Sequence, residues 1–222
     1  MDVPQLSGPV VDEAQILTSQ ASGAITSALL ELNQKEDVQF QVLIVKTLIN
    51  ETIEGYSIKV VDEWKLGKKG KDRAALLLIA LDDKKMRIEV GRGLEGNLTD
   101  LTTNRILDEM KPYFRKGDYD NGVALGLSLM ARAEGLKLNF KGVMKPRHKR
   151  TGSAPLVLFA IFGLIGFLQF FFPNTRGRGG RGGFGGFGGG GFGGGGFGGG
   201  GGGSSWSGGG GGFSGGGSSS SW

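Results

Sequence analysis

Carboxylates are the side chains of this 222-residue sequence with the most chemical scope, because it has no cysteine and only one histidine, His148. The lack of thiols excludes disulfides, thiol nucleophiles, iron–sulfur clusters and cysteine-ligated zinc, and one imidazole excludes a His-rich metal site. His148 lies in the basic run KPRHKR, so a Ser-His-Asp triad is not expected in the folded part. We therefore assign no catalytic residue from the sequence.

Three acids, Asp12, Glu95 and Asp100, stand where predicted strands end or helices begin. Each has a simple local interpretation: Asp100 as a helix cap, for example, and Asp12 as an acceptor for its own loop. The alternative is that the three converge on a hard cation such as Ca²⁺, which takes about 6 to 8 oxygen ligands and needs neither Cys nor His. Arg73 and Arg92 would then hold a phosphate or carboxylate, although an ion pair with one of the acids is the simpler expectation.

The segment Gly91-Arg92-Gly93-Leu94-Glu95-Gly96 matches the pattern GxGxxG. It follows the second arm of a predicted hairpin rather than the first strand of a βαβ unit, and Glu95 would face the pyrophosphate of a dinucleotide. We interpret it as a tight connection that brings Arg92 and Glu95 to the end of a sheet.

Apolar spacing predicts the elements that must position these residues. Helices are expected at 17–32, 52–64, 119–136 and from about residue 99 to the Lys111-Pro112 pair, and strands at 40–48, 74–81 and 86–90. This order of elements predicts an α/β domain with a mixed sheet covered by helices.

Composition divides the chain into four parts. Residues 1–140 hold 18 basic and 21 acidic residues, a net charge of −3, so the overall charge of +5 comes from a basic, acid-free remainder. We do not expect the domain to bind nucleic acid. A basic linker (141–153) leads to a 19-residue apolar run, 154–172, that is long enough for one transmembrane helix and so for contact with the bilayer.

The remaining residues, 173–222, consist after residue 175 only of Gly, Ser, Phe, Trp and Arg. Such a segment cannot build a hydrophobic core, so we predict a disordered tail. Its three arginines resemble RGG repeats, but three charges release few counterions, and RNA binding is not the favoured interpretation.

Three blocks of the sequence resemble the TPM domain family: VVDEAQILT at 10–18, RAALLLIALDDKKMRIEVGRGLEGNLTD at 73–100 and PYFRKGDYDNGVALGL at 112–127. The apolar helix and glycine-rich tail resemble the bacterial membrane-anchored members of the YgcG type. The resemblance implies a three-layer αβα sandwich with a mixed central sheet. It also implies calcium binding, with Glu95 and Asp100 as the main ligands and Asp12 and Asp118 as further ones.

The start MDVPQLSGPVVD is similar to the part of bacterial members that follows a signal peptide, so a removed signal peptide is expected. The resemblance thus implies a single-pass protein of the bacterial cell membrane, with an exported, periplasmic or extracellular domain and a cytoplasmic tail. Charge counting alone favours the reverse orientation, since five basic residues of 141–150 precede the apolar run and three follow it.

The function that the resemblance implies is assembly, repair or quality control of membrane proteins, with LemA-type membrane proteins as the first candidate partners. The alternative is a metal-dependent acid phosphatase, because some plant relatives are described as such. The sequence does not decide whether the chain is an enzyme, nor its oligomeric state.

Overall fold

The computed structural model describes residues 1–140 and 206–222, and these belong to one compact unit. The predicted linker (141–153), the predicted membrane helix (154–172) and residues 173–205 of the predicted tail lie outside the described residues. Within 1–140 and 206–222, no helix is both long and apolar enough to cross a membrane.

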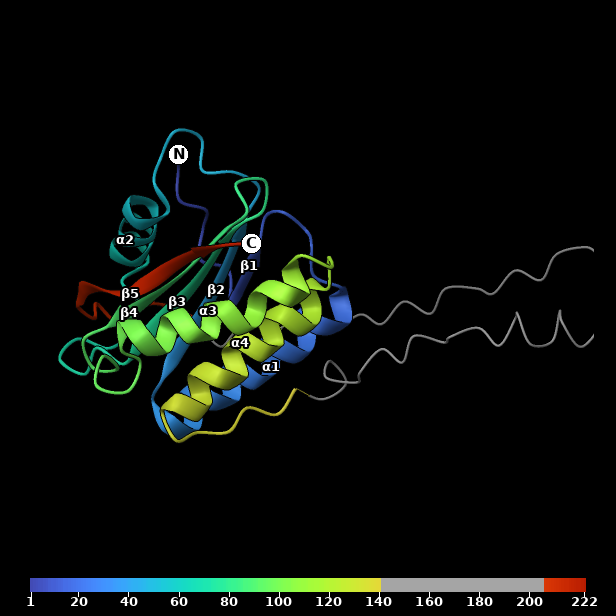
Figure 1. The fold of residues 1–222 in the computed structure, drawn as a ribbon. Coiled ribbons are helices and arrows are strands. Elements are labelled where there is room, and N and C mark those ends of the chain that lie inside the picture. The colour runs from blue at the N-terminus through green and yellow to red at the C-terminus, as the bar shows by residue number, and fades with distance from the viewer. Residues whose placement is uncertain (141–205) are drawn as a thin grey trace, which may run out of the picture. The chain divides into compact units, whose positions relative to one another are not determined.

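A five-stranded sheet forms the centre of the domain (Figure 1). Its strands lie in sequence order: β1 (Val10–Asp12), β2 (Gln39–Val45), β3 (Ala74–Ala80), β4 (Lys85–Gly91) and β5 (Phe213–Ser221). The first three are mutually parallel, while β4 runs antiparallel to both β3 and β5. The prediction of a mixed sheet is confirmed, and the predicted strands gave β2, β3 and β4, but neither β1 nor β5 was predicted.

Helices cover both faces of the sheet (Figure 1). Side chains alternate along each strand, so Val42, Leu77 and Ile88 enter one core with α1 (Ser19–Glu36), α3 (Asp100–Phe114) and α4 (Tyr119–Ala133). Leu43 and Leu76 enter a second core with α2 (Ile53–Trp64). The result is an α/β fold with the sheet as the middle of three layers.

Helix α3 continues past the predicted break at Lys111-Pro112 and ends at Phe114. Proline lacks the N–H that would bond four residues back, which is why a break was expected there. Only two helical residues follow Pro112, and Arg115 donates its backbone N–H to the carbonyl of Lys111 at 2.9 Å. Burial of Phe114 in the first core favours keeping this last turn helical.

The prediction of a disordered tail is wrong for the described end of the chain. Residues 206–222, here called the C-terminal segment, cross the domain, and their last part forms β5 on the outer edge of β4. A Gly- and Ser-rich segment cannot build a core, but this segment does not need one, because β4 supplies a row of backbone donors and acceptors that order it.

Candidate functional site

The outer edge of β4 (Lys85–Gly91), here called the acceptor edge, holds an extended piece of polypeptide. Antiparallel pairing runs from Lys85 opposite Ser221 to Gly91 opposite Phe213, with a bulge between Val90 and Gly91. Helix α3 contacts β5 on one side of the sheet and α2 contacts it on the other. An edge strand with free backbone groups is a ready template for another strand, and here the chain itself occupies that position.

The glycines of the 91–96 connection bring it close to the backbone of 71–74. A Cβ on Gly91 would lie 2.5 Å from the carbonyl oxygen of Asp72, and one on Gly93 would lie 2.0 Å from that of Lys71. The predicted tight connection is therefore confirmed, and close approach is the reason for Gly91 and Gly93. It leaves Arg92 and Glu95 beside the C-terminal segment, since Gly212 and Gly216 lie against these two side chains.

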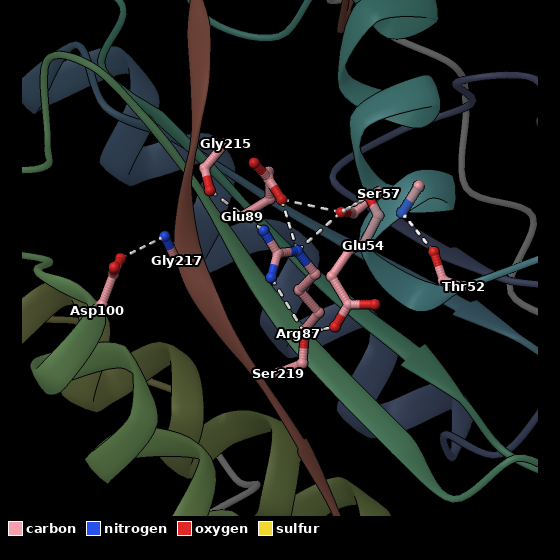
Figure 2. Close-up of polar contacts among 10 residues, drawn as sticks. Thr52, Glu54, Ser57, Arg87, Glu89, Asp100, Gly215, Gly217 and Ser219 are labelled. Atoms are coloured by element: carbon pink, nitrogen blue, oxygen red, sulfur yellow. Dashed lines mark hydrogen bonds and ion pairs between the residues drawn. The ribbon is translucent and has the colours of Figure 1, made fainter.

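The two main predicted metal ligands, Asp100 and Glu95, each accept a hydrogen bond from the C-terminal segment. Asp100 accepts a 2.8 Å hydrogen bond from the backbone N–H of Gly217 (Figure 2), and Glu95 accepts one from the hydroxyl of Ser214. Asp100 is the first residue of α3, and the side chain that caps this helix belongs to Thr99. The interpretation of Asp100 as the cap is therefore wrong.

A buried polar cluster lies on the α2 side of the acceptor edge (Figure 2). The Arg87 Nε atom lies 2.6 Å from Glu89 Oε2 and 2.9 Å from Ser57 Oγ, and all three side chains are buried. Arg87 also donates to the Ser219 hydroxyl at 3.1 Å and to the Gly215 carbonyl at 3.4 Å. The cluster therefore joins β4 to β5 through side chains as well as backbone.

Ser219 adds a direct link between β5 and α2. Its hydroxyl donates a 2.5 Å hydrogen bond to Glu54 Oε1, and this bond lowers the pKa of the Glu54 carboxyl against the opposing effect of partial burial. One serine of the C-terminal segment thus contacts both a cation and a carboxylate.

Two tryptophans fix the ends of the C-terminal segment. The indole N–H of Trp206 donates a 2.7 Å hydrogen bond to the side-chain carbonyl of Gln41, which is fully buried. The ring of Trp222 packs edge-on against Phe114, with centroids 4.8 Å apart. An indole that combines apolar area with one directed N–H is well suited to such anchoring.

The other two predicted ligands, Asp12 and Asp118, lie elsewhere. Asp12 ends β1, and its Oδ2 atom accepts the backbone N–H of Leu17 at 2.9 Å, so its predicted bond to its own loop is confirmed. Its Oδ1 atom is buried without a hydrogen-bond partner. Asp118 precedes α4 but makes no capping bond, and both of its oxygens accept from the Asn121 amide.

The four acids therefore do not fit one calcium site. Three strand spacings, about 14 Å, separate β1 from β4. Asp12 and Gly91 also lie at opposite ends of their strands, since Asp12 is level with Met86. Among the described residues, no three acidic or histidine side chains lie close enough together to share a metal ion. The structure brings together Glu95 and Asp100, and what joins them is the C-terminal segment.

The two predicted anion-binding arginines each lie in an ion pair. Arg92 lies 3.3 Å from Asp72, and Arg73 lies 3.7 Å from Glu134, whose pKa is raised by burial. Pairing was the simpler expectation, but the partners are neither Asp12, Glu95 nor Asp100. The two arginines are therefore already neutralised by carboxylates that the sequence analysis did not consider.

Sequence reasoning missed the residues that hold the C-terminal segment from the α2 side. The alternation in Met86-Arg87-Ile88-Glu89-Val90 is typical of a strand with one solvent face. In the structure that face is covered, because Arg87 and Glu89 lie under α2 and beside β5. Two opposite charges two positions apart on one strand face were the available signal for an ion pair.

Two solved structures are similar to this chain, and the first of them has the same architecture. The N-terminal domain of a protein from P. gingivalis is 28% identical, with a TM-score of 0.55, over 60% of this chain and 90% of that one. The BA42 protein from the psychrophilic bacterium Bizionia argentinensis is 17% identical, with a TM-score of 0.48, over 56% of this chain and 87% of that one. No curated protein matches the chain.

The family model described as the TPM domain matches residues 10–133, from the first residue of β1 to the last of α4. This is more than half of the chain, and it leaves the C-terminal segment outside the match. The chain therefore belongs to the TPM domain family.

Proposed function

We propose that this chain is a membrane-anchored, polypeptide-binding module that acts in the assembly, repair or quality control of membrane proteins. The observation that supports it is the acceptor edge, which binds an extended segment through backbone pairing from Lys85 to Gly91. Backbone pairing recognises the extended state of a chain, and surrounding side chains then select its sequence. Incompletely assembled membrane proteins offer such extended segments.

Membrane attachment is supported by the sequence alone. The apolar run 154–172 is long enough to span a bilayer. We propose that it anchors an exported domain in the bacterial cell membrane. LemA-type membrane proteins are the first partners to test.

The predicted membrane helix and the pairing of β5 with β4 place the C-terminal segment on different sides of the membrane. A single crossing at 154–172 would place residues 206–222 opposite the domain, whereas pairing of β5 with β4 needs both on one side. The chain has no cysteine, so single variants Ser27→Cys and Ser221→Cys, both at exposed positions, report each side cleanly. Labelling of both by an impermeant maleimide in intact cells is expected if the pairing persists there; labelling of Ser27→Cys alone would assign the segment to the cytoplasm.

A crosslinking experiment tests the binding function. A photo-crosslinking residue replaces the exposed Lys85 in the full chain, with and without Gly217→Val, whose added Cβ would lie 1.9 Å from the carbonyl oxygen of Ile88. We expect adducts with membrane proteins to increase when Gly217→Val frees the edge, and not with the control Ser207→Val, at an exposed position outside β5. Absence of any such adduct from native membranes in all variants would refute the proposal.

Calcium binding becomes a narrower proposal centred on Asp12, whose buried Oδ1 atom lacks a partner that a cation would supply. Calcium at 100 times its dissociation constant would add about 2.7 kcal/mol to the free energy of unfolding. We expect Asp12→Asn to remove this stabilisation and Glu95→Gln to retain it. Equal loss in both variants, or no stabilisation of the wild-type chain at millimolar calcium, would contradict the proposal.

The phosphohydrolase hypothesis, with Asp12, Glu95 and Asp100 as metal ligands and Arg73 or Arg92 as phosphate clamp, ranks second. All of these residues except Asp12 have every described charged group engaged within the chain. Glu95 and Asp100 bind the C-terminal segment, while Arg73 and Arg92 pair with acids. Hydrolysis of a generic phosphomonoester by the purified full chain, abolished by Asp100→Asn with the fold intact, would reverse this order.

A further inference from the structure

The acceptor edge requires glycine at one position of the strand that it holds. Gly217 has φ of +123°, and a Cβ there would meet the Ile88 carbonyl oxygen at 1.9 Å. A Cβ on Gly212 would lie 1.9 Å from the guanidinium of Arg92, and one on Gly216 would lie 2.9 Å from the carboxylate of Glu95. The Ile88 oxygen is backbone and cannot move aside, so a strand with a larger residue at Gly217 cannot approach β4 in the same way, whereas the flexible ends of Arg92 and Glu95 can shift.

Polar side chains around the edge bind two serine hydroxyls and one backbone N–H of the C-terminal segment. Asp100 binds the N–H of Gly217, Glu95 binds Ser214, and Ser219 lies between Glu54 and Arg87. These contacts come from the 91–96 connection, α3, α2 and β4, so four separate parts of the domain converge on the segment. Trp206 and Trp222 add one contact near each end of the segment.

The connection between domain and segment does not restrict which copy supplies the strand. Phe140 and Trp206 are separated by 65 residues, which could span at most about 220 Å. This limit exceeds the size of a domain of about 140 residues, so the segment of one chain can reach the acceptor edge of a neighbour. Exchange between membrane-anchored copies requires the segment to lie on the same side of the membrane as the domains, which the cysteine labelling described above decides.

We propose that the acceptor edge is a recognition site for residues 206–222, and that a second copy of the chain supplies this segment when the chain's own strand leaves. Copies would then be linked by exchange of β5, with the same contacts made between chains as within one. This inference rests on the proposed function, since it names the ligand of the same edge.

Peptide binding to the full chain tests the inference. The probe is a fluorescein-labelled synthetic peptide of residues 206–222, and the readout is anisotropy with detergent-solubilised chain. We expect the Gly217→Val chain to bind this peptide at least tenfold more tightly than the wild-type chain, whose edge is filled by its own segment. The Ser207→Val chain, altered at an exposed position outside β5 and with its edge still filled, should behave as wild type.

Peptide variants supply the matched controls. A peptide with Gly217→Val should bind the opened chain at least tenfold more weakly, and a peptide with Ser207→Val, altered outside β5, should bind as the unmodified one. Equal binding of all three peptides would overturn the inference, because the edge would then not read the sequence.

A cleavable chain covers the case in which Gly217→Val prevents folding. A specific protease site is placed within residues 141–205 of the otherwise wild-type chain. Cleavage after folding then separates the chain's C-terminal segment from its domain. When excess labelled peptide is added, the released segment should be replaced by it. Failure of the labelled peptide to replace the released segment would overturn the inference.

The two proposals can fail separately. Crosslinks from position 85 to membrane proteins without peptide binding would leave the proposed function standing and remove the second copy as ligand. Peptide binding without such crosslinks would limit the edge to recognition between copies and refute the wider function.

Discussion

Asp100 accepts a 2.8 Å hydrogen bond from the backbone N–H of Gly217, a residue 117 positions further along the chain. Because Asp100 begins α3 and Gly217 lies within β5, this bond ties the start of a core helix to the last strand of the sheet. An acid that the sequence places among metal ligands is thus an acceptor for the chain's own backbone.

Asp100→Ala should weaken the attachment of β5. The variant loses one acceptor for a backbone N–H, worth about 1 kcal/mol. Faster hydrogen–deuterium exchange at Gly217, measured by NMR, would show the loss. Asp100→Asn keeps an acceptor oxygen and should change exchange less; an identical effect of both variants would indicate that the charge of α3's first turn, not the bond, matters.

Arg87→Ala should be among the most destabilising single substitutions near the acceptor edge. It leaves the Glu89 carboxylate buried without its cation, which costs about 3 to 5 kcal/mol. Urea unfolding measures the loss. The double variant Arg87→Met, Glu89→Leu should recover most of it, because no unpaired charge remains.

The pair of Arg92 and Asp72, in which the arginine is exposed, provides the comparison for that cluster. Its arginine side chain is 60% exposed, so Arg92→Ala should change the free energy of unfolding by less than about 1 kcal/mol. A larger loss from Arg92→Ala than from Arg87→Ala would contradict the assignment of the buried cluster as the main polar link.

Removal of Trp222 should release the end of β5. The edge-on contact with Phe114 is worth about 0.5 to 1.5 kcal/mol beyond the buried area. Shortening the chain by this residue should move the ring resonances of Phe114 and raise exchange of the Ser221 amide. Resonances of Phe114 that do not change would place the indole elsewhere in solution.

Acid should loosen β5 through Glu54. The Ser219 hydroxyl lowers the pKa of this carboxyl below its ordinary value of 4.5, so the charged form is favoured when β5 is attached. The resulting stabilisation is fully present above pH 4.5 and is lost as the pH falls through the lowered pKa. Exchange at Ser219 should therefore rise more between pH 6 and pH 3.5 in wild type than in Glu54→Gln, after correction for intrinsic rates. Equal rises would exclude Glu54 as the cause.

The sequence by itself determined the inner part of the fold. Runs such as Ala74–Ala80 and the stripe Ile25, Leu29 and Leu32 carry strand and helix patterns that no distant residue needs to complete. The glycines of 91–96 likewise indicated a tight connection. Cores form wherever apolar faces of predictable period meet, so the α/β class followed from local pattern.

Only the tertiary structure decided the edge of the sheet and the roles of the acids. Strand β5 consists mainly of glycine and serine, which have low strand propensity, and it pairs through backbone groups that every residue type shares. Its partners Glu54, Glu95 and Asp100 lie more than 100 residues away in the chain. The sequence does not distinguish a carboxylate that caps a helix from one that binds a metal or holds a strand. Its neighbours in space determine which of these roles it has.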